Sequence, residues 1–118
     1  MADTWRHPGP RPAHPIVMAL SGSQPSTVLD LKRQAVREVL ARYRVANPRV
    51  FGSAATGADR PGSDLDLLVD ALPGTTLFDL GHLQDELEDL LGVPVDVVTP
   101  LDLPNRFREE VVAQAQPL

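Results

Sequence analysis

The feature that most restricts how this chain can fold is a strand that begins with two aspartates, SDLDLLVD at residues 63–70. The apolar run over residues 67–69 is typical of a buried strand. Side chains alternate along a strand, so Asp64 and Asp66 are expected to face one side of the sheet while Leu65 faces the other. The fold therefore has to bury one face of this strand and leave two carboxylates together on the opposite face.

Length and composition predict one small domain. The chain has 118 residues, of which 42% are hydrophobic, enough for one core without disulfides or a structural metal. Cysteine is absent, which excludes a thiolate metal site and is compatible with a reducing cytoplasm. The formal net charge is −5, whereas nucleic-acid-binding proteins usually carry a basic excess, so no direct nucleic-acid binding is expected. No apolar run approaches the ~20 residues of a membrane span, and we expect a cytoplasmic protein.

Two parts can be distinguished along the chain. Residues 1–25 hold five of the 12 prolines and little apolar periodicity, which predicts an extended or disordered leader. Residues 26–118 form the predicted domain, whose first helix is expected to begin at Ser26 or Thr27 as N-cap. Further elements are expected as a short strand at 50–51, a strand at 64–70, a helix over 75–91, a strand at 93–99 and a helix over 103–114. This order implies a small α/β (α+β) domain with helices flanking a short β-sheet.

The two aspartates at the start of the second strand favour a divalent cation. Like charges side by side repel, and Mg²⁺ prefers carboxylate and phosphate oxygens. Two such ions about 3.5–4 Å apart can activate an attacking oxygen and stabilise a leaving pyrophosphate. For an isolated pair, the more common arrangement is that Asp64 caps the loop and Asp66 faces water. Asp70 lies about 13 Å beyond Asp66 at 3.3 Å per residue, which is typical of a strand-end residue rather than a ligand.

Asp96 and the pair Gly52-Ser53 add to this pattern. Asp96 lies inside VPVDVVT, where a lone buried carboxylate would be costly, unless this strand lies beside the second one and brings Asp96 to the same cations. The alternative is an edge strand with Asp96 facing water. Gly52 ends a strand, where glycine allows close approach of a ligand, and Ser53 opens a turn whose N–H groups would face an anion. A Gly-Ser pair also occurs in simple turns, but Gly-Ser, ten residues and Asp-x-Asp match by chance in only about one chain in a thousand of this length.

The stretch that carries all four of these positions is GSAATGADRPGSDLDLLVD, residues 52–70. It resembles the signature of the DNA-polymerase-β-like nucleotidyltransferases, and more closely that of the minimal nucleotidyltransferases that act as antitoxins. The resemblance extends over about residues 26–115, since LLGVPVDVVTP is similar to the family's third-carboxylate strand and FREEVVAQAQPL to its closing helix. It implies a small mixed β-sheet flanked by helices.

The resemblance also implies an activity and a partner. Asp64 and Asp66 would bind two Mg²⁺ ions, Asp96 would complete the metal site or assist deprotonation of the acceptor, and Gly52 and Ser53 would hold the triphosphate of ATP. The reaction would transfer AMP to a hydroxyl, a tyrosine, of a toxin of the HEPN ribonuclease class, within a hetero-oligomer.

One departure from the family pattern keeps alternatives open. Thr56 stands where many relatives have Arg, so a cationic phosphate contact is either missing or supplied by Arg60, Arg106 or Arg108. A non-catalytic antitoxin that occludes its toxin is one alternative, because the acidic face of the helix over 75–91 could meet a basic ribonuclease. That face is expected to be solvated and contains Asp85, Glu86, Glu88 and Asp89. A small-molecule nucleotidyltransferase acting on an antibiotic is the other, although such enzymes usually need a further acceptor-binding domain.

Overall fold

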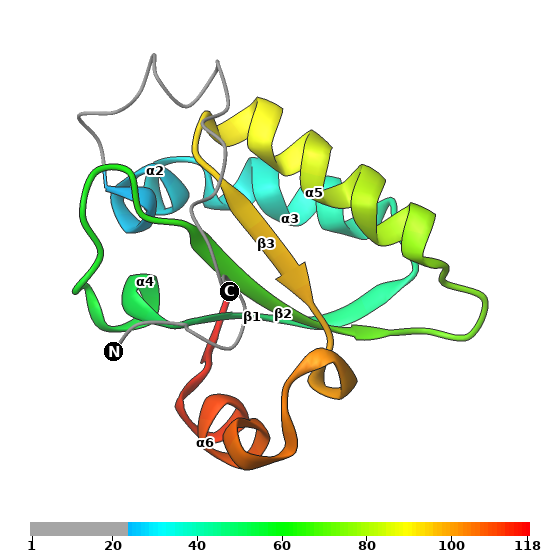
Figure 1. The fold of residues 1–118 in the computed structure, drawn as a ribbon. Helices are drawn as coiled ribbons and strands as arrows, with labels where there is room; N and C mark the ends of the chain where they lie inside the picture. Colours follow the sequence, from blue (N-terminus) through cyan, green and yellow to red (C-terminus); the bar gives the residue numbers. More distant parts are fainter. Residues whose placement is uncertain (1–23) are drawn as a thin grey trace.

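A four-stranded mixed sheet forms the centre of the computed structural model, which describes residues 24–118 (Figure 1). The strand order is β3-β2-β1-β4, with β2 and β3 parallel and the other two pairs antiparallel. The strands are β1 (Val45–Phe51), β2 (Leu65–Ala71), β3 (Val95–Val98) and β4 (Gln116–Pro117). The predicted class, a small mixed sheet with flanking helices, is confirmed. The predicted leader lies outside the described residues except for Gln24 and Pro25.

Three helices cover one face of the sheet and build the main core. They are α2 (Pro25–Leu31), α3 (Arg33–Ala41) and α5 (Leu77–Leu91). Alternate strand residues, such as Leu65 and Leu67, are fully buried against α5 residues such as Leu83 and Leu87. The side chain of Thr76 caps α5, and Gly92 ends it in the left-handed conformation.

The opposite face carries a smaller layer. The short helix α4 (Ser53–Thr56) follows β1 directly, and η1 (Pro100–Asp102) leads into α6 (Asn105–Gln114), which lies on the far side of the sheet from α3 and α5 (Figure 1). Phe51, Leu68 and Leu103 form the buried cluster of this layer. Asp66, two residues before Leu68 on β2, is therefore on the same face as this smaller layer. None of the helices within residues 24–118 has the length and hydropathy of a membrane span.

The predicted N-cap of the first helix is wrong. Neither Ser26 nor Thr27 is an N-cap, because α2 begins at Pro25 after the N-cap Gln24. Instead, the N–H and Oγ of Ser26 donate to the carboxylate of Asp59, at 2.7 and 2.8 Å. A side chain distant in sequence thus satisfies the first turn, which a local capping rule cannot predict.

Two further elements differ from the predictions. The expected single helix is divided at Lys32, which has φ −118° and separates α2 from α3. Strand β1 begins at Val45 rather than Val50, because a bulge between Ala46 and Arg49 accommodates Asn47 and Pro48 within the strand. Strand β4 has two residues and no periodicity by which it could be predicted.

One acidic residue of α5 lies in the core rather than on the solvated face. Glu88 is only 6% exposed, whereas Asp85 and Asp89 are exposed as predicted. Its carboxylate accepts a hydrogen bond from the N–H of Val95 at 2.9 Å. The helix pattern could not show this, because the contact depends on how β3 returns beside α5.

Candidate active site

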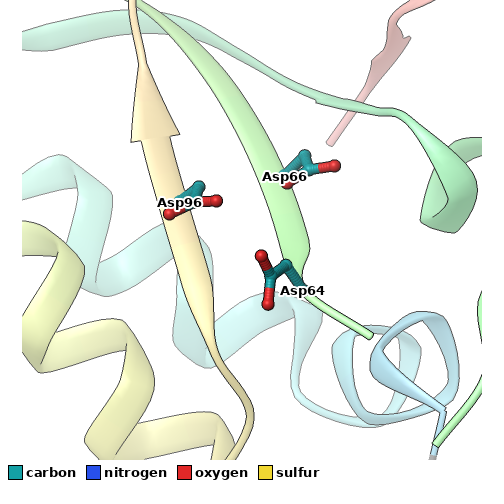
Figure 2. A group of neighbouring side chains, drawn as sticks. All are labelled: Asp64, Asp66 and Asp96. Carbon is teal, nitrogen blue, oxygen red and sulfur yellow. The ribbon is translucent and has the colours of Figure 1, made fainter. Parts of the chain in front are cut away.

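Strand pairing brings the three predicted carboxylates together. Strands β2 and β3 run parallel with Asp66 opposite Asp96, and Asp64 immediately precedes β2. One carboxylate oxygen from each of the three lies within 4.8 Å of the others, and the side chains gather over β2 and β3 (Figure 2). Asp66 is buried, and Asp64 and Asp96 are half-buried. Strand β3 is indeed an edge strand, but Asp96 is near the other two carboxylates rather than isolated in water.

The donor set suits a hard divalent cation. Three oxygens of carboxylate type at this spacing match the ligands that Mg²⁺ takes from proteins. Two unit charges 4.8 Å apart repel by about 3 kcal/mol at an effective dielectric constant of about 20, so a bound cation would relieve a substantial repulsion. The residues present therefore fit a metal ion of the kind that nucleotidyl transfer requires.

Gly52 lies against this carboxylate group. The antiparallel register of β1 and β2 places Phe51 opposite Asp66, so the chain turns at Gly52 directly beside the Asp66 side chain. Gly52 has φ +72° and ψ −152°, a conformation open almost only to glycine. A Cβ atom at this position would lie 2.4 Å from Oδ2 of Asp66. Ser53, half-buried, is the first residue of α4 and thus opens the turn next to the carboxylates.

The loop between α4 and β2 is tied down by a residue that the sequence did not single out. Asp59 is 1% exposed, and its backbone carbonyl accepts a hydrogen bond from Nε2 of Gln24 at 2.6 Å, in addition to the two bonds that Ser26 donates to its side chain. The loop that leads to Asp64 is thereby anchored to α2. A single buried aspartate in a loop gives no signal in sequence, because its partners are more than 30 positions away.

The predicted cationic residues occupy different places. Arg108 donates to the carbonyl oxygens of Pro100 and Leu103, at 2.7 and 3.1 Å, and so stabilises the turn before α6. The guanidinium of Arg106 lies over the ring of Phe107, 4.8 Å from its centroid. Arg60 is exposed in the loop that leads to Asp64. Of the three candidates, Arg60 is the nearest in sequence to Asp64.

Two other polar residues of the predicted region, Thr56 and Asp70, have partners outside the carboxylate group. The hydroxyl of Thr56 donates to the carbonyl oxygen of Ser53 at 3.2 Å, within α4. Asp70 forms an ion pair with Arg49 at 2.7 Å and lies outside the carboxylate group. Its position agrees with the expectation of a strand-end residue.

A Gly-Ser turn opens a short helix beside a carboxylate group on neighbouring strands of a mixed sheet. This arrangement is typical of a nucleotidyltransferase. The family model described as "Nucleotidyltransferase domain" matches residues 32–117, and the chain belongs to this family. The resemblance seen in the sequence is thereby confirmed, and the chain is an enzyme of the nucleotidyltransferase class.

Known proteins of this kind are similar over most of their length. A protein of Methanocaldococcus jannaschii named "Putative protein adenylyltransferase MJ0435" is 33% identical over 86 residues, which cover 73% of this chain and 91% of that protein. A solved structure described as a "putative minimal nucleotidyltransferase" is 46% identical, with a TM-score of 0.71, and covers 79% of this chain and 95% of its own. A chain from a solved toxin-antitoxin with AMP-PNP is 22% identical with a TM-score of 0.62, covering 71% and 69%, which shows a shared fold.

Proposed function

We propose that this protein is a Mg²⁺-dependent protein adenylyltransferase that acts as a cytoplasmic antitoxin. It would transfer AMP from ATP to a hydroxyl, a tyrosine, of a HEPN-type ribonuclease toxin with which it forms a hetero-oligomer. The observation that carries the proposal is the convergence of Asp64, Asp66 and Asp96 beside the backbone of Gly52. The protein adenylyltransferase name of the Methanocaldococcus relative and the toxin-antitoxin with AMP-PNP support the choice of acceptor, nucleotide and partner.

The carboxylate group would hold the metal. Asp64, Asp66 and Asp96 supply the oxygens, and the close backbone of Gly52 keeps Asp66 within that group. When bound, Mg²⁺ supplies positive charge that neutralises the triphosphate and polarises the reacting oxygens.

The chain's own residues have separate tasks in the transfer. Ser53 and the backbone at Gly52 bind the terminal phosphates and orient the α-phosphate toward the carboxylates. The acceptor hydroxyl oxygen forms a bond to the α-phosphorus, and the bond between that phosphorus and the pyrophosphate oxygen breaks. The hydroxyl proton passes to the carboxylate of Asp96, and pyrophosphate leaves with the electron pair.

The test is label transfer from α-labelled ATP to the product of the neighbouring gene. We expect wild type to transfer the label in the presence of Mg²⁺ and the double variant Asp64→Asn with Asp66→Asn to lose transfer altogether. Intact mass measurement should show the partner gaining mass in units of AMP. Glu38→Gln, which changes an exposed carboxylate on α3, is the matched control and should transfer as wild type does. Unchanged transfer by the double variant would refute the metal assignment.

A second candidate function is neutralisation by occlusion, without chemistry. It is favoured by Thr56, which offers no cation to the phosphates, and by the exposed carboxylates Asp85 and Asp89 of α5, which suit a basic partner. The same double variant separates the two functions. If it still blocks the toxin's ribonuclease activity at a stoichiometric ratio, occlusion is the mechanism; if it fails to block, adenylylation is.

A further inference from the structure

The third carboxylate of the site lies on a short edge strand of the described sheet. Strand β3 has four residues, and within residues 24–118 its only neighbouring strand is β2. Short edge strands have an unpaired side and open more readily than central strands. The distance from Asp96 to Asp66 therefore depends on what holds β3 in place.

Two side chains of α5 occupy the outer side of β3. The carboxylate of Glu88 accepts the N–H of Val95 at 2.9 Å, and Oε1 of Gln84 accepts the N–H of Val97 at 3.1 Å. Glu88 and Gln84 are four residues apart and so lie on one face of the helix. Val95 and Val97 are the neighbours of Asp96 on either side, and their N–H groups point to the same edge of the strand. The helix thus supplies the acceptors that a further strand would otherwise provide.

Glu88 lies in the last turn of α5 and is only 6% exposed. The helix dipole disfavours a negative charge there, and burial of a carboxylate costs free energy that hydrogen bonds have to offset. A hydrogen bond to an ionised acceptor is about twice as strong as one to a neutral acceptor, which suits a residue that has to hold a strand.

We propose that Glu88 and Gln84 are positioning residues for the metal site. By binding the N–H groups on both sides of Asp96, they hold its carboxylate within reach of Asp64 and Asp66. The inference rests on the proposed function, because it assumes that these three carboxylates bind a cation.

The test compares variants that remove an acceptor with one that keeps it. Glu88→Leu and Gln84→Leu remove an acceptor at similar volume, Glu88→Gln retains one, and Glu38→Gln, at an exposed position on α3, is the control. We expect the two leucine variants to weaken Mn²⁺ binding, measured by the electron paramagnetic resonance of the free ion, about 10–100-fold. Glu88→Gln should remain within about 3-fold of wild type, and Glu38→Gln should be unchanged. Amide hydrogen exchange should accelerate at Val95 in Glu88→Leu and at Val97 in Gln84→Leu.

The outcomes separate this inference from the proposed function. Wild-type Mn²⁺ affinity in the folded leucine variants, or unchanged exchange at both amides, overturns the positioning role and leaves the proposed function standing. Equally weak Mn²⁺ binding by wild type and by Asp64→Asn overturns the proposed metal site, and the positioning role with it. If Glu88→Leu does not fold, Gln84→Leu decides alone, because Gln84 is only half-buried.

Discussion

Replacing Gly52 with alanine is the substitution whose effect on the site follows most directly from the structure. Gly52 has φ +72° and ψ −152°, and a Cβ atom there would lie 2.4 Å from Oδ2 of Asp66. Ordinary van der Waals contact begins at 3.4 Å, so the carboxylate of Asp66 has to move by about 1 Å. The substitution therefore strains the backbone and displaces a predicted metal ligand at the same time.

The two effects have different magnitudes and different readouts. Holding a non-glycine residue in this backbone region costs on the order of 1–3 kcal/mol, which lowers the melting temperature of a domain of this size by roughly 5–20 °C. A displacement of about 1 Å at a reacting group can cost about 100-fold in rate, and disturbance of a metal ligand about 10–100-fold in metal affinity. We expect Gly52→Ala to show both losses.

Gly57 provides the matched control. It also has a positive φ, +75°, but a Cβ atom there meets nothing within 4 Å. Gly57→Ala should therefore lose about 1–2 kcal/mol of stability through backbone strain and keep its metal affinity. The assay is a melting curve for each variant together with a Mn²⁺ titration, performed at a temperature where both are folded. If Gly52→Ala binds Mn²⁺ as tightly as Gly57→Ala does, the contact with Asp66 does not shape the site and the reasoning is wrong.

Two further predictions concern residues away from the carboxylate group. Asp70→Asn removes the ionic partner of Arg49, whose side chain is 10% exposed. It should lower the free energy of unfolding by about 1–2 kcal/mol, measured by thermal unfolding. If the variant instead needs more Mg²⁺ for transfer, Asp70 is a metal ligand. The hydrogen bond from Tyr43 to Glu86, helped by burial, raises the pKa of Tyr43 above its ordinary value of 10.0. Because the raised pKa belongs to the folded state, the stabilisation is complete below pH 10 and is lost as the pH rises through the folded pKa. Tyr43 is the one tyrosine of the chain, so an absorbance titration should show that it ionises above its ordinary pKa. Tyr43→Phe should flatten the decline in stability above pH 10. If stability falls with pH equally steeply in both proteins, this prediction is wrong.

The parts of the site that could be predicted are those that depend on alternation and on local turn chemistry. Asp64 and Asp66 share a face because strand side chains alternate, and Gly52 was expected to allow close approach because it ends a strand. Asp96 could be placed beside them because a carboxylate within an apolar strand has to meet a compensating group. The same local rules located α5, which was expected over 75–91 and spans Leu77–Leu91.

The parts that could not be predicted depend on partners distant in sequence. Ser26 has the side chain of an N-cap but bonds to Asp59, 33 positions away. Glu88 has the spacing of a solvated helical residue, yet β3 returns beside α5 and buries it. The bulge between Ala46 and Arg49 lets β1 continue through an Asn-Pro pair that usually ends a strand. In each case tertiary contact outweighs a local preference that is worth only about 1 kcal/mol.

Two opposing interactions act on β3, which are repulsion among the carboxylates and hydrogen bonds to α5. Repulsion among Asp64, Asp66 and Asp96 acts between β2 and β3 and opposes their close pairing. Water screens part of this repulsion, because two of the three carboxylates are half-buried. Hydrogen bonds to charged acceptors contribute about 1.5–3 kcal/mol each and neutral ones about 1 kcal/mol, a total comparable with one pair's repulsion. The acceptors on α5 thus act on the outer side of β3 against the repulsion that the carboxylates exert on its inner side, and so help to keep the three carboxylates together.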